Sequence, residues 1–432
     1  MTFHDLNLSK PLLKALDLLE LTEPTHIQRE VFSVIMSGRD VLGIAQTGTG
    51  KTLAYLLPCL RMWKFTKDIH PQVLIVVPTR ELVAQVVEEA QKLSMYQNVK
   101  VLGVYGGVNM RTQEGYIREG VDFLVATPGR LNDLILNGAV STKAIKQLII
   151  DEVDEMLSLG FLPQLKSILD LIPARRQNLL FSATMSPVIE ELIEDFFTSP
   201  VKIEATASGV PVEKINQVAY AVPNFNTKYN LLKLLIQDKT EFQKVVVFVS
   251  SRKYADIISE KLSEELGEEI GVMHSNKAQN TRFRTTNEFN EGSIRILIAT
   301  DLFARGLDIT DISHVINFEM PEDPEYYLHR IGRTGRAERA GESISFYTAH
   351  EVVLKEAAES YMNQAIPELE LPEELEISDE LIEDEKEVIR IPNVQVKIAT
   401  KPSWEKQIKA EYNEHGKKIA VRKNPAKKKR KK

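Results

Sequence analysis

The chain has 432 residues, of which 43% are apolar, and this length and composition predict two or three domains with buried cores. Cys59 is the single cysteine, so the sequence excludes an intramolecular disulfide and favours a reducing compartment, and we expect a cytoplasmic protein. No apolar run approaches the roughly 18 residues of a membrane span, and residues 1–20 resemble an amphipathic helix and not a signal peptide.

The formal net charge of −7 argues at first against a nucleic-acid partner, but the charges are unevenly distributed. Residues 401–432 contain thirteen Lys or Arg and three Glu, a local charge of +10. Residues 367–390 hold eleven acids against two basic residues, a local charge of −9. We expect an acidic extension followed by a basic, disordered arm that binds phosphates, although a tail that serves solubility alone has the same composition.

Between Asp40 and about Ile203, short apolar runs alternate with patterns of helical period. Alternation of this kind predicts a parallel sheet that is covered by helices. The expected strands are residues 41–44, 73–77, 99–104, 123–126, 148–150 and 178–181.

A phosphate-binding loop follows the first expected strand and precedes an expected helix, as the run Ala45-Gln46-Thr47-Gly48-Thr49-Gly50-Lys51-Thr52. Glycines let backbone N–H groups close around phosphate oxygens at a helix N-terminus, which favours negative charge. In such a loop Lys51 reaches the β- and γ-phosphates and Thr52 ligates Mg²⁺. Ala45 stands where the general pattern has Gly. We expect the loop residues 47–52 to bind the phosphates of a nucleotide.

Two acids, Asp151 and Glu152, end the apolar run 148–150 about 100 residues after the loop. The carboxyl edge of a parallel sheet is where open α/β folds bind ligands. Asp151 is suited to hold the Mg²⁺ shell, and Glu152 is suited to orient or deprotonate the attacking water. The alternative is an ordinary helix N-terminus, where Asp and Glu are common.

A second series of strands is expected at residues 245–249, 270–273, 295–299, 314–318 and 341–347. The segment near 205–214, with Thr, Ser, Gly and Pro, has the composition of a linker. Two similar domains joined by a linker predict a cleft that opens and closes around a ligand.

Two polar runs in the second half lack an obvious packing role. The run 329–336, His-Arg-Ile-Gly-Arg-Thr-Gly-Arg, carries arginines that can neutralise charge on a transferring phosphoryl group, or else forms a basic loop for RNA phosphates. Asp308 is placed to accept hydrogen bonds from ribose hydroxyls, and its alternative is a helix cap.

Together these motifs resemble the DEAD-box ATP-dependent RNA helicases of superfamily 2, over about residues 3–350. The resemblance includes Pro24-Thr25-His26-Ile27-Gln28, Pro78-Thr79-Arg80-Glu81-Leu82, Gly106-Gly107, Thr127-Pro128-Gly129-Arg130, Ser182-Ala183-Thr184 and the Gln279-x-x-Arg282 pattern. The basic tail points, within the family, to a bacterial subgroup of the RhlE type.

The resemblance implies two tandem RecA-like α/β domains: an ATP-binding domain at 1–205, a linker at 206–215, and a C-terminal helicase domain at 216–366. An acidic extension at 367–400 and the basic tail at 401–432 follow. It also implies a role for individual residues, including some that are named above. Phe3, Leu21, Gln28 and Asp308 would contact the nucleotide; Arg333 and Arg336 would be arginine fingers; Arg80, Gly107, Thr127, Arg130, Arg282 and Thr300 would contact RNA; Asp154, Ser182, Thr184 and His329 would couple hydrolysis to unwinding.

Four positions depart from the family pattern, namely Leu21, Val153, Ser275 and Phe303. Val153 is a small apolar change that leaves the carboxylates intact. Leu21 stands where the family has an aromatic that stacks on adenine, so we expect Gln28 to carry more of the adenine selectivity.

The sequence therefore predicts an enzyme that couples hydrolysis of ATP with Mg²⁺ to local, largely sequence-independent unwinding of RNA or remodelling of RNA–protein complexes. The expected partners are RNA and, for the tail, ribosomal or RNA-degradation proteins, with no membrane. Two alternatives remain at this point: a DNA-directed translocase of the same superfamily, and an ATP-gated RNA clamp without turnover.

Overall fold

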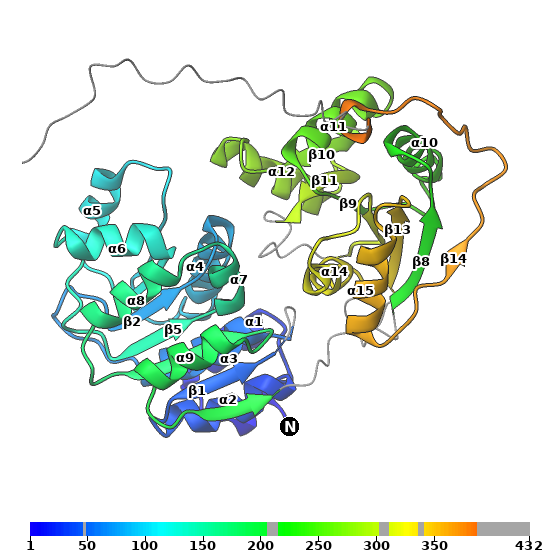
Figure 1. Ribbon diagram of the computed structural model, residues 1–432. Coiled ribbons are helices and arrows are strands. Elements are labelled where there is room, and N and C mark those ends of the chain that lie inside the picture. Colours follow the sequence, from blue (N-terminus) through cyan, green and yellow to red (C-terminus); the bar gives the residue numbers. More distant parts are fainter. Residues whose placement is uncertain (46–48, 205–214, 302–310, 336–340, 387–432) are drawn as a thin grey trace, which may run out of the picture. The chain divides into compact units, whose positions relative to one another are not determined.

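The computed structural model describes residues 1–45, 49–204, 215–301, 311–335 and 341–386. The chain up to Glu385 forms one compact unit that contains two α/β domains (Figure 1). The linker expected at 206–215 lies almost wholly outside the described residues, and so do the basic tail and residues 387–400 of the acidic extension.

The first domain is built on a parallel sheet in the order β3-β4-β2-β5-β6-β1-β7. Its strands are β1 Val41–Ile44, β2 Val73–Val76, β3 Val101–Val104, β4 Phe123–Ala126, β5 Gln147–Ile150, β6 Gln177–Ser182 and β7 Val201–Glu204. Its helices are η1 Phe3–Asp5, α1 Lys10–Leu18, α2 His26–Met36, α3 Lys51–Met62, α4 Arg80–Leu93, α5 Met110–Arg118, α6 Pro128–Leu136, α7 Val153–Ser158, α8 Leu162–Leu171 and α9 Pro187–Phe196.

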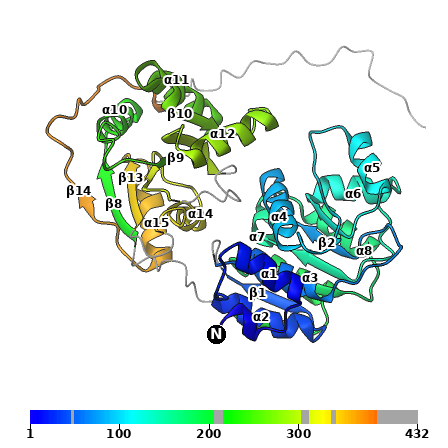
Figure 2. The same ribbon diagram turned by 180° about the vertical axis from the view of Figure 1, so that it is seen from behind.

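Alternate residues of the central strands enter two separate cores, because successive side chains point to opposite faces of a sheet. In β2, Val73 and Ile75 pack with α1 to α4, whereas Leu74 and Val76 pack with α6 to α9. Figure 1 views the face under α7 to α9, and Figure 2 views the face under α1 to α4. A sheet covered on both faces explains why its strands are almost continuously apolar.

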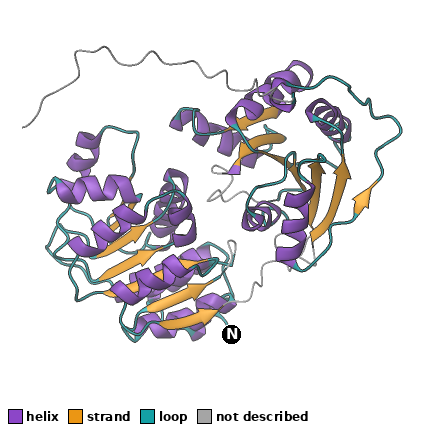
Figure 3. Cartoon of the chain, in the orientation of Figure 1, coloured by secondary structure: helices purple, strands orange, loops and turns teal. Residues whose placement is uncertain are grey.

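The second domain repeats this plan, with the parallel order β10-β11-β9-β12-β13-β8-β14. Its strands are β8 Ile215–Ala221, β9 Val245–Val249, β10 Ile270–Met273, β11 Ile296–Thr300, β12 His314–Asn317, β13 Gly341–Tyr347 and β14 Glu368–Leu369. Its helices are α10 Phe225–Leu235, α11 Arg252–Leu266, η3 Gly267–Glu269, α12 Gln279–Glu291, α14 Pro324–Ile331, α15 Val352–Met362 and η4 Glu383–Glu385 (Figure 3).

Side-chain caps explain why several helices begin where they do. Thr79 accepts a hydrogen bond from Leu82 N at the start of α4, and Ser186, Asn224 and Ser251 do the same for α9, α10 and α11. Each cap satisfies one of the N–H groups that a helix leaves free at its first turn. Among the described helices, none is long and apolar enough to cross a membrane.

The predicted pair of parallel-sheet domains is confirmed, and each predicted strand corresponds to an observed strand within two residues at either end. Three strands were not predicted. β7 alternates apolar and charged residues, β8 has Asn216 and Gln217 after its first residue, and β14 has two residues only. These strands form because a neighbouring strand offers its edge, which local composition does not show.

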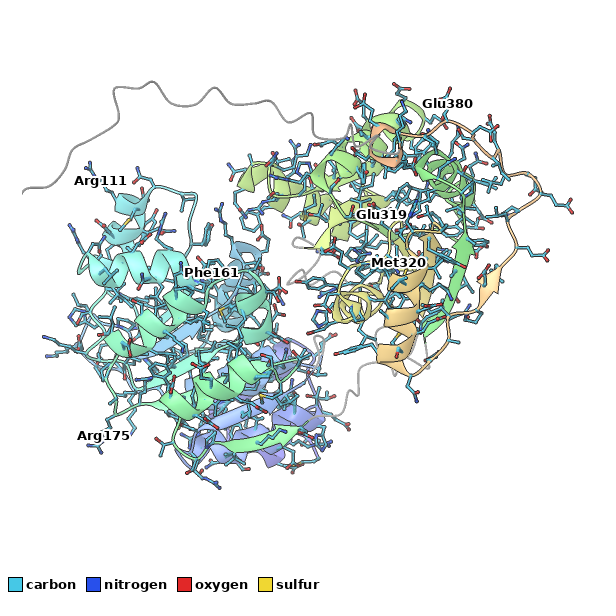
Figure 4. The ribbon with its side chains drawn as sticks, viewed as in Figure 1. Arg111, Phe161, Arg175, Glu319, Met320 and Glu380 are labelled. Atoms are coloured by element: carbon cyan, nitrogen blue, oxygen red, sulfur yellow. The ribbon has the colours of Figure 1, made fainter. Side chains whose placement is uncertain are left out.

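Part of the acidic extension packs against the second domain. We call residues 368–385 the acidic strap: it begins with β14, which pairs with β8, and continues along α10. Asn226 Nδ2 donates to the carbonyl of Glu380 at 2.9 Å, and Asn230 Nδ2 donates to that of Glu376 at 2.8 Å. Glu380 itself faces solvent (Figure 4). The segment expected to follow the second domain thus adds to its sheet and its core.

Candidate nucleotide and RNA site

The phosphate loop joins β1 to α3 at the carboxyl edge of the first sheet. Gly50 precedes the helix with a φ of +86°, a conformation that favours glycine. A Cβ at this position would overlap the amide of Gln28, which donates to the Gly50 carbonyl at 3.1 Å. Thr25 Oγ1 donates to the Thr49 carbonyl at 2.9 Å. The start of α2 therefore holds the end of the loop, while Thr47 and Gly48 lie outside the described residues.

Lys51, the first residue of α3, is only 6% exposed. Its Nζ is buried and has no hydrogen-bond partner among the residues that the structure describes. A buried ammonium without a partner is costly, and a phosphate group at this place would remove that cost. Thr52, the next residue, is half-buried in the first turn of the same helix.

Asp151 and Glu152 follow β5, at the same edge of the sheet. The Asp151 carboxylate accepts a hydrogen bond from Glu152 N at 2.9 Å. Glu152 has a φ of +53°, in the left-handed region that is strained for a side chain of this size, and such strain concentrates at functional positions. Burial raises the pKa of both carboxyl groups, and the nearby Lys51 ammonium opposes that rise. The alternative of an ordinary helix N-terminus does not account for that backbone.

Asp154 links this edge to the end of β6. Its Oδ2 accepts from Ala183 N at 2.8 Å and from Thr184 N at 3.1 Å. Ser182, the last residue of β6, is fully buried, and its hydroxyl has no partner among the described residues. A change in the position of Asp154 would therefore be transmitted directly to residues 183 and 184.

A small cavity joins these groups to the second domain. Its lining residues are Lys51, Glu152, Asp154, Glu155, Ala183, His329 and Arg333. Arg333 is close enough to Glu152 for its positive charge to lower the pKa of that carboxyl group. The predicted Arg336 and Asp308 lie outside the described residues.

Three residues predicted at the adenine have different surroundings. Phe3 is 2% exposed, and its backbone N–H donates to the Thr22 carbonyl at 3.2 Å, so it supports the segment beside Leu21 from the core. Leu21 is 37% exposed. Gln28 is buried, and its amide oxygen accepts from Thr25 N at 2.9 Å. Both ends of the Gln28 amide thus contact backbone groups of the loop and the helix start.

Four of the residues predicted to contact RNA, Arg80, Gly107, Thr127 and Arg130, belong to the first domain and follow strands β2, β3 and β4. Arg80 packs over Gly107, whose φ is +81°, and a Cβ there would overlap the guanidinium. Arg130 donates to the Val108 carbonyl at 3.0 Å and to the amide oxygen of Gln113. Thr127, buried at the end of β4, precedes α6. The Val108 carbonyl thereby fixes Arg130, whereas Arg80 donates to the amide oxygen of Gln279 at 3.4 Å.

Arg282 forms polar contacts with two side chains. One of them, Glu81, was not predicted as a site residue from the sequence. Its guanidinium lies 3.2 Å from the Glu81 carboxylate and also donates to Gln279. Gln279 in turn donates to Glu81 at 3.0 Å. Glu81 is an acidic residue in the first turn of α4, and its side chain is buried. Its position next to Arg80 in the sequence could have indicated a role in the site. Thr300, also predicted, is buried at the end of β11.

Arg330 is a second residue that the sequence did not single out. It is fully buried, donates to both oxygens of Asp301, and also donates to the Glu319 carbonyl at 2.6 Å. A bidentate arginine of this kind fixes geometry. Arg330 therefore anchors the run that carries His329 and Arg333.

Among the described residues, no group of three or more His, Cys, Asp or Glu side chains forms a metal cage. A magnesium ion that binds with a nucleotide needs only one or two protein ligands, because phosphates and water supply the rest. Thr52 and Asp151 fit that requirement in number and kind.

The chain is similar to known protein families and to solved structures. The model of the DEAD/DEAH box helicase family matches residues 25–192, and that of the helicase conserved C-terminal domain matches residues 227–338. A DEAD-box ATP-dependent RNA helicase, CshA of Geobacillus kaustophilus, is 38% identical over 81% of this chain and 74% of its own length. The ATP-dependent RNA helicase DbpA of Bacillus subtilis is 34% identical over 87% of this chain and 78% of its own length.

Among solved structures, S. cerevisiae Dbp5 bound to RNA and ADP BeF3 is similar, with a TM-score of 0.77 and 28% sequence identity. The similarity covers 85% of this chain and 95% of the yeast chain.

Proposed function

The chain belongs to the DEAD-box family of ATP-dependent RNA helicases, and we propose that its hydrolytic site is the carboxyl edge of the first sheet. The observation that carries this proposal is the buried Lys51 ammonium without a partner, in one cavity with Glu152 and Arg333. A positive charge in this position stabilises β- and γ-phosphate oxygens and the charge that develops on them.

Glu152 is the residue proposed to accept a proton from the attacking water. The raised pKa of its carboxyl group brings its proton affinity closer to what a general base needs near neutral pH. Thr52 and Asp151 would hold a Mg²⁺ ion, which supplies positive charge to the phosphate oxygens when it is bound. Lys51 would hold the phosphates in line with the water.

Arg333 and Arg336 are proposed as the arginine fingers. Arg333 lines the cavity with Glu152, which supports its role. The ion pair of Arg330 with Asp301 holds the end of α14 in place, and this fixes the backbone that carries Arg333. Asp308 is proposed to bind the ribose hydroxyls.

Gln28 is proposed to read the adenine edge. It must then exchange its hydrogen bonds to Thr25 N and the Gly50 carbonyl for bonds to the base. Such an exchange would couple adenine binding to the phosphate loop, because the Gly50 carbonyl would lose the Gln28 amide and keep only its bond from Ala54 N. Leu21 and Phe3 would support the same side of the nucleotide.

RNA is proposed to contact Arg80, Gly107, Thr127, Arg130, Arg282 and Thr300, mostly through phosphate and 2′-hydroxyl groups. Contacts of this kind carry little sequence information, so binding would be largely independent of sequence. Asp154, Ser182, Thr184 and His329 are proposed to couple hydrolysis to local loss of base pairs. The hydrogen bonds from Ala183 and Thr184 to Asp154 support that coupling.

The basic tail is proposed to tether RNA or to recruit ribosomal or RNA-degradation proteins, and the protein is proposed to act in the cytoplasm. Deleting residues 401–432 should flatten the log–log salt dependence of single-stranded RNA binding by about 3 to 4 units, if about five cations contact phosphates. An unchanged slope would leave the tail without an RNA role.

The decisive experiment compares ATP hydrolysis and strand displacement with RNA, DNA and hybrid duplexes of matched sequence. We expect RNA to stimulate hydrolysis and the RNA duplex to be separated. Stimulation by DNA to the same degree would favour the translocase alternative. RNA binding that depends on ATP without turnover would favour the clamp.

A further inference from the structure

The amino-terminal edge of the first sheet carries a groove of about 830 Å³. It is lined by residues that precede or begin strands β1, β2, β5 and β6, including Gly38, Gln72, Lys146 and Gln177. Because all strands of this sheet are parallel, the groove and the nucleotide site lie at opposite edges. A molecule in the groove would leave the nucleotide site accessible.

The lining is basic. It contains Lys143, Lys146, Arg175 and Arg176 against one carboxylate, that of Asp68. Within the described ranges, no carboxylate forms an ion pair with any of the four cations. Asp68 accepts a hydrogen bond from His70 N at 3.0 Å. Arg175 projects into solvent at the margin of the domain (Figure 4). We call this set the basic groove.

Arg176 and Thr66 give the basic groove fixed polar groups. Arg176 is half-buried, and its guanidinium donates to the Pro173 carbonyl at 2.8 Å and to Asn178 Oδ1 at 2.8 Å. Asp40, the nearby carboxylate, accepts from Asn178 N, Asn178 Nδ2 and Thr198 N. The Thr66 hydroxyl is buried and has no partner in the described part of the chain. Both groups would gain from an anionic ligand.

An exposed aromatic side chain adjoins one of the lining residues in sequence. Phe65, next to Thr66 in the loop between α3 and β2, is 68% exposed. Lys64 and Lys67 on the same loop are also exposed. A single exposed aromatic needs no explanation on a protein surface. An aromatic flanked by lysines beside a basic groove, however, is the arrangement that binds single-stranded nucleic acid, with phosphates on the cations and a base on the ring.

We propose that the basic groove binds a second segment of single-stranded RNA, with phosphates on Lys143, Lys146 and Arg175 and a base stacked on Phe65. This inference rests on RNA as the substrate of the nucleotide-driven site. The groove would hold RNA through both the ATP-bound and ATP-free states, because no group of the nucleotide site reaches it. Two attachment points on one strand raise the effective concentration of the RNA at the catalytic edge.

The first test uses the triple variant Lys143→Gln, Lys146→Gln, Arg175→Gln in the full-length protein. Its affinity for labelled oligouridylate is measured against salt, with a strand of about 40 nucleotides and one of about 10, the longer exceeding a single site. We expect the log–log slope for the long strand to flatten by about 2 units, from three lost phosphate contacts. Affinity for the short strand and RNA-saturated ATP turnover should not change.

The matched control removes three exposed lysines elsewhere on the first domain, as Lys10→Gln, Lys14→Gln, Lys202→Gln. The log–log salt slope of this control for the long strand should equal that of the wild-type protein. Equal flattening in both triple variants would reduce the effect to general charge and overturn the proposal, and so would parallel lines for the groove variant and the unchanged protein. Unaltered turnover in both variants separates failure of this inference from failure of the hydrolytic site.

A second pair of variants tests whether a base stacks on the ring of Phe65. Phe65→Leu keeps an apolar surface but loses the ring, so long-strand affinity should fall roughly 5-fold or more, and Phe65→Trp should restore it. An unchanged affinity in Phe65→Leu would contradict base stacking.

Position is tested by photocrosslinking. Cys59 is buried, and burial raises the pKa of its thiol, so a new cysteine on the surface is the reactive one. Lys143→Cys carrying a benzophenone maleimide should crosslink to the long RNA in the presence and absence of ATP, and Lys10→Cys should not. A fully labelled Lys143→Cys protein that gives no crosslink would overturn the proposal.

Discussion

The two domains have sheets with the same strand order, but the charged residues at the carboxyl edges of these sheets have different surroundings. Numbered from the start of each domain, both sheets have the strand order 3-4-2-5-6-1-7. In the first domain, the strand at the centre, β5, ends in Asp151 and Glu152. In the second domain the equivalent strand, β12, is followed by Phe318 and Glu319.

Glu319 and the residue after it form hydrogen bonds within the second domain. Its carboxylate accepts from Ser250 N at 2.8 Å and from Ser250 Oγ at 2.7 Å. Met320 N, the next backbone donor, bonds to Glu351 at 3.0 Å (Figure 4). In the first domain, by contrast, Glu152 lies in a cavity with Lys51 and Arg333.

Two buried lysines show the same contrast. Lys51 and Lys228 both lie in the first turn of the helix that follows the first strand of their domain. Lys228 Nζ forms a buried ion pair with Glu351 at 2.5 Å, whereas Lys51 Nζ has no hydrogen-bond partner among the described residues. The comparison teaches that the fold fixes where charges lie, and that only the domain whose charges lack internal partners can offer them to a substrate.

The largest expected effect separates Glu152 from Glu319. Glu152→Gln should lower RNA-stimulated phosphate release by about 10²- to 10⁴-fold, because the amide keeps the shape but accepts no proton. ATP affinity, measured with a fluorescent analogue, should hold. Glu319→Gln is the matched control and should leave turnover at saturation within about 2-fold, since its contacts are structural. Near-normal turnover in Glu152→Gln would contradict the base assignment.

Arg333→Ala should lower turnover by about 10³-fold with a much smaller change in nucleotide affinity, because a finger arginine acts on the transition state. The measurement is kcat and the dissociation constant for ATP in the same preparation. Arg284→Ala, an exposed arginine of α12 paired with Glu288, serves as the control. A collapse of affinity with an intact kcat would make Arg333 a ground-state ligand instead.

Substitutions of Lys228 and Lys51 should have different effects on the free energy of unfolding. Lys228→Met leaves the Glu351 carboxylate without its cation and should lower the free energy of unfolding by about 3 kcal/mol. Lys51→Met removes no hydrogen bond within the described residues, so it should destabilise the protein much less than Lys228→Met but should abolish ATP binding. Urea unfolding followed by circular dichroism reports both domains, and the fluorescence of Trp63 follows the first. Equal destabilisation by both substitutions would break the comparison.

The smallest expected effect concerns Leu21. Leu21→Phe should tighten ATP binding by about 0.5 to 1.5 kcal/mol, because a ring adds stacking that leucine lacks. Gln28→Ala should reduce the preference for ATP over GTP, and by less in the Leu21→Phe background. Titrations with ATP and GTP measure both effects. No gain from phenylalanine would show that the exposed Leu21 side chain does not face the base.

The sequence by itself determined the chemistry and most of the sheets. Apolar runs such as Val73 to Val76 predict buried parallel strands, because a strand covered on both faces needs apolar residues at every position. The phosphate loop and the Asp151-Glu152 pair were visible because glycine and charge at strand ends follow local rules. For these features the sequence neighbours decide the structure.

Only the tertiary structure decided the rest. β8 contains Gln217, whose amide oxygen is satisfied by the hydroxyl of Tyr327, more than a hundred residues away. Lys228 has an internal carboxylate as its partner because the fold brings Glu351 to it. Glu351 lies far from Lys228 in sequence, so no local pattern predicts this pair. The basic groove likewise gathers residues from four separate loops. Partners of this kind are set by which strands meet in the folded sheet, and no local pattern records that meeting.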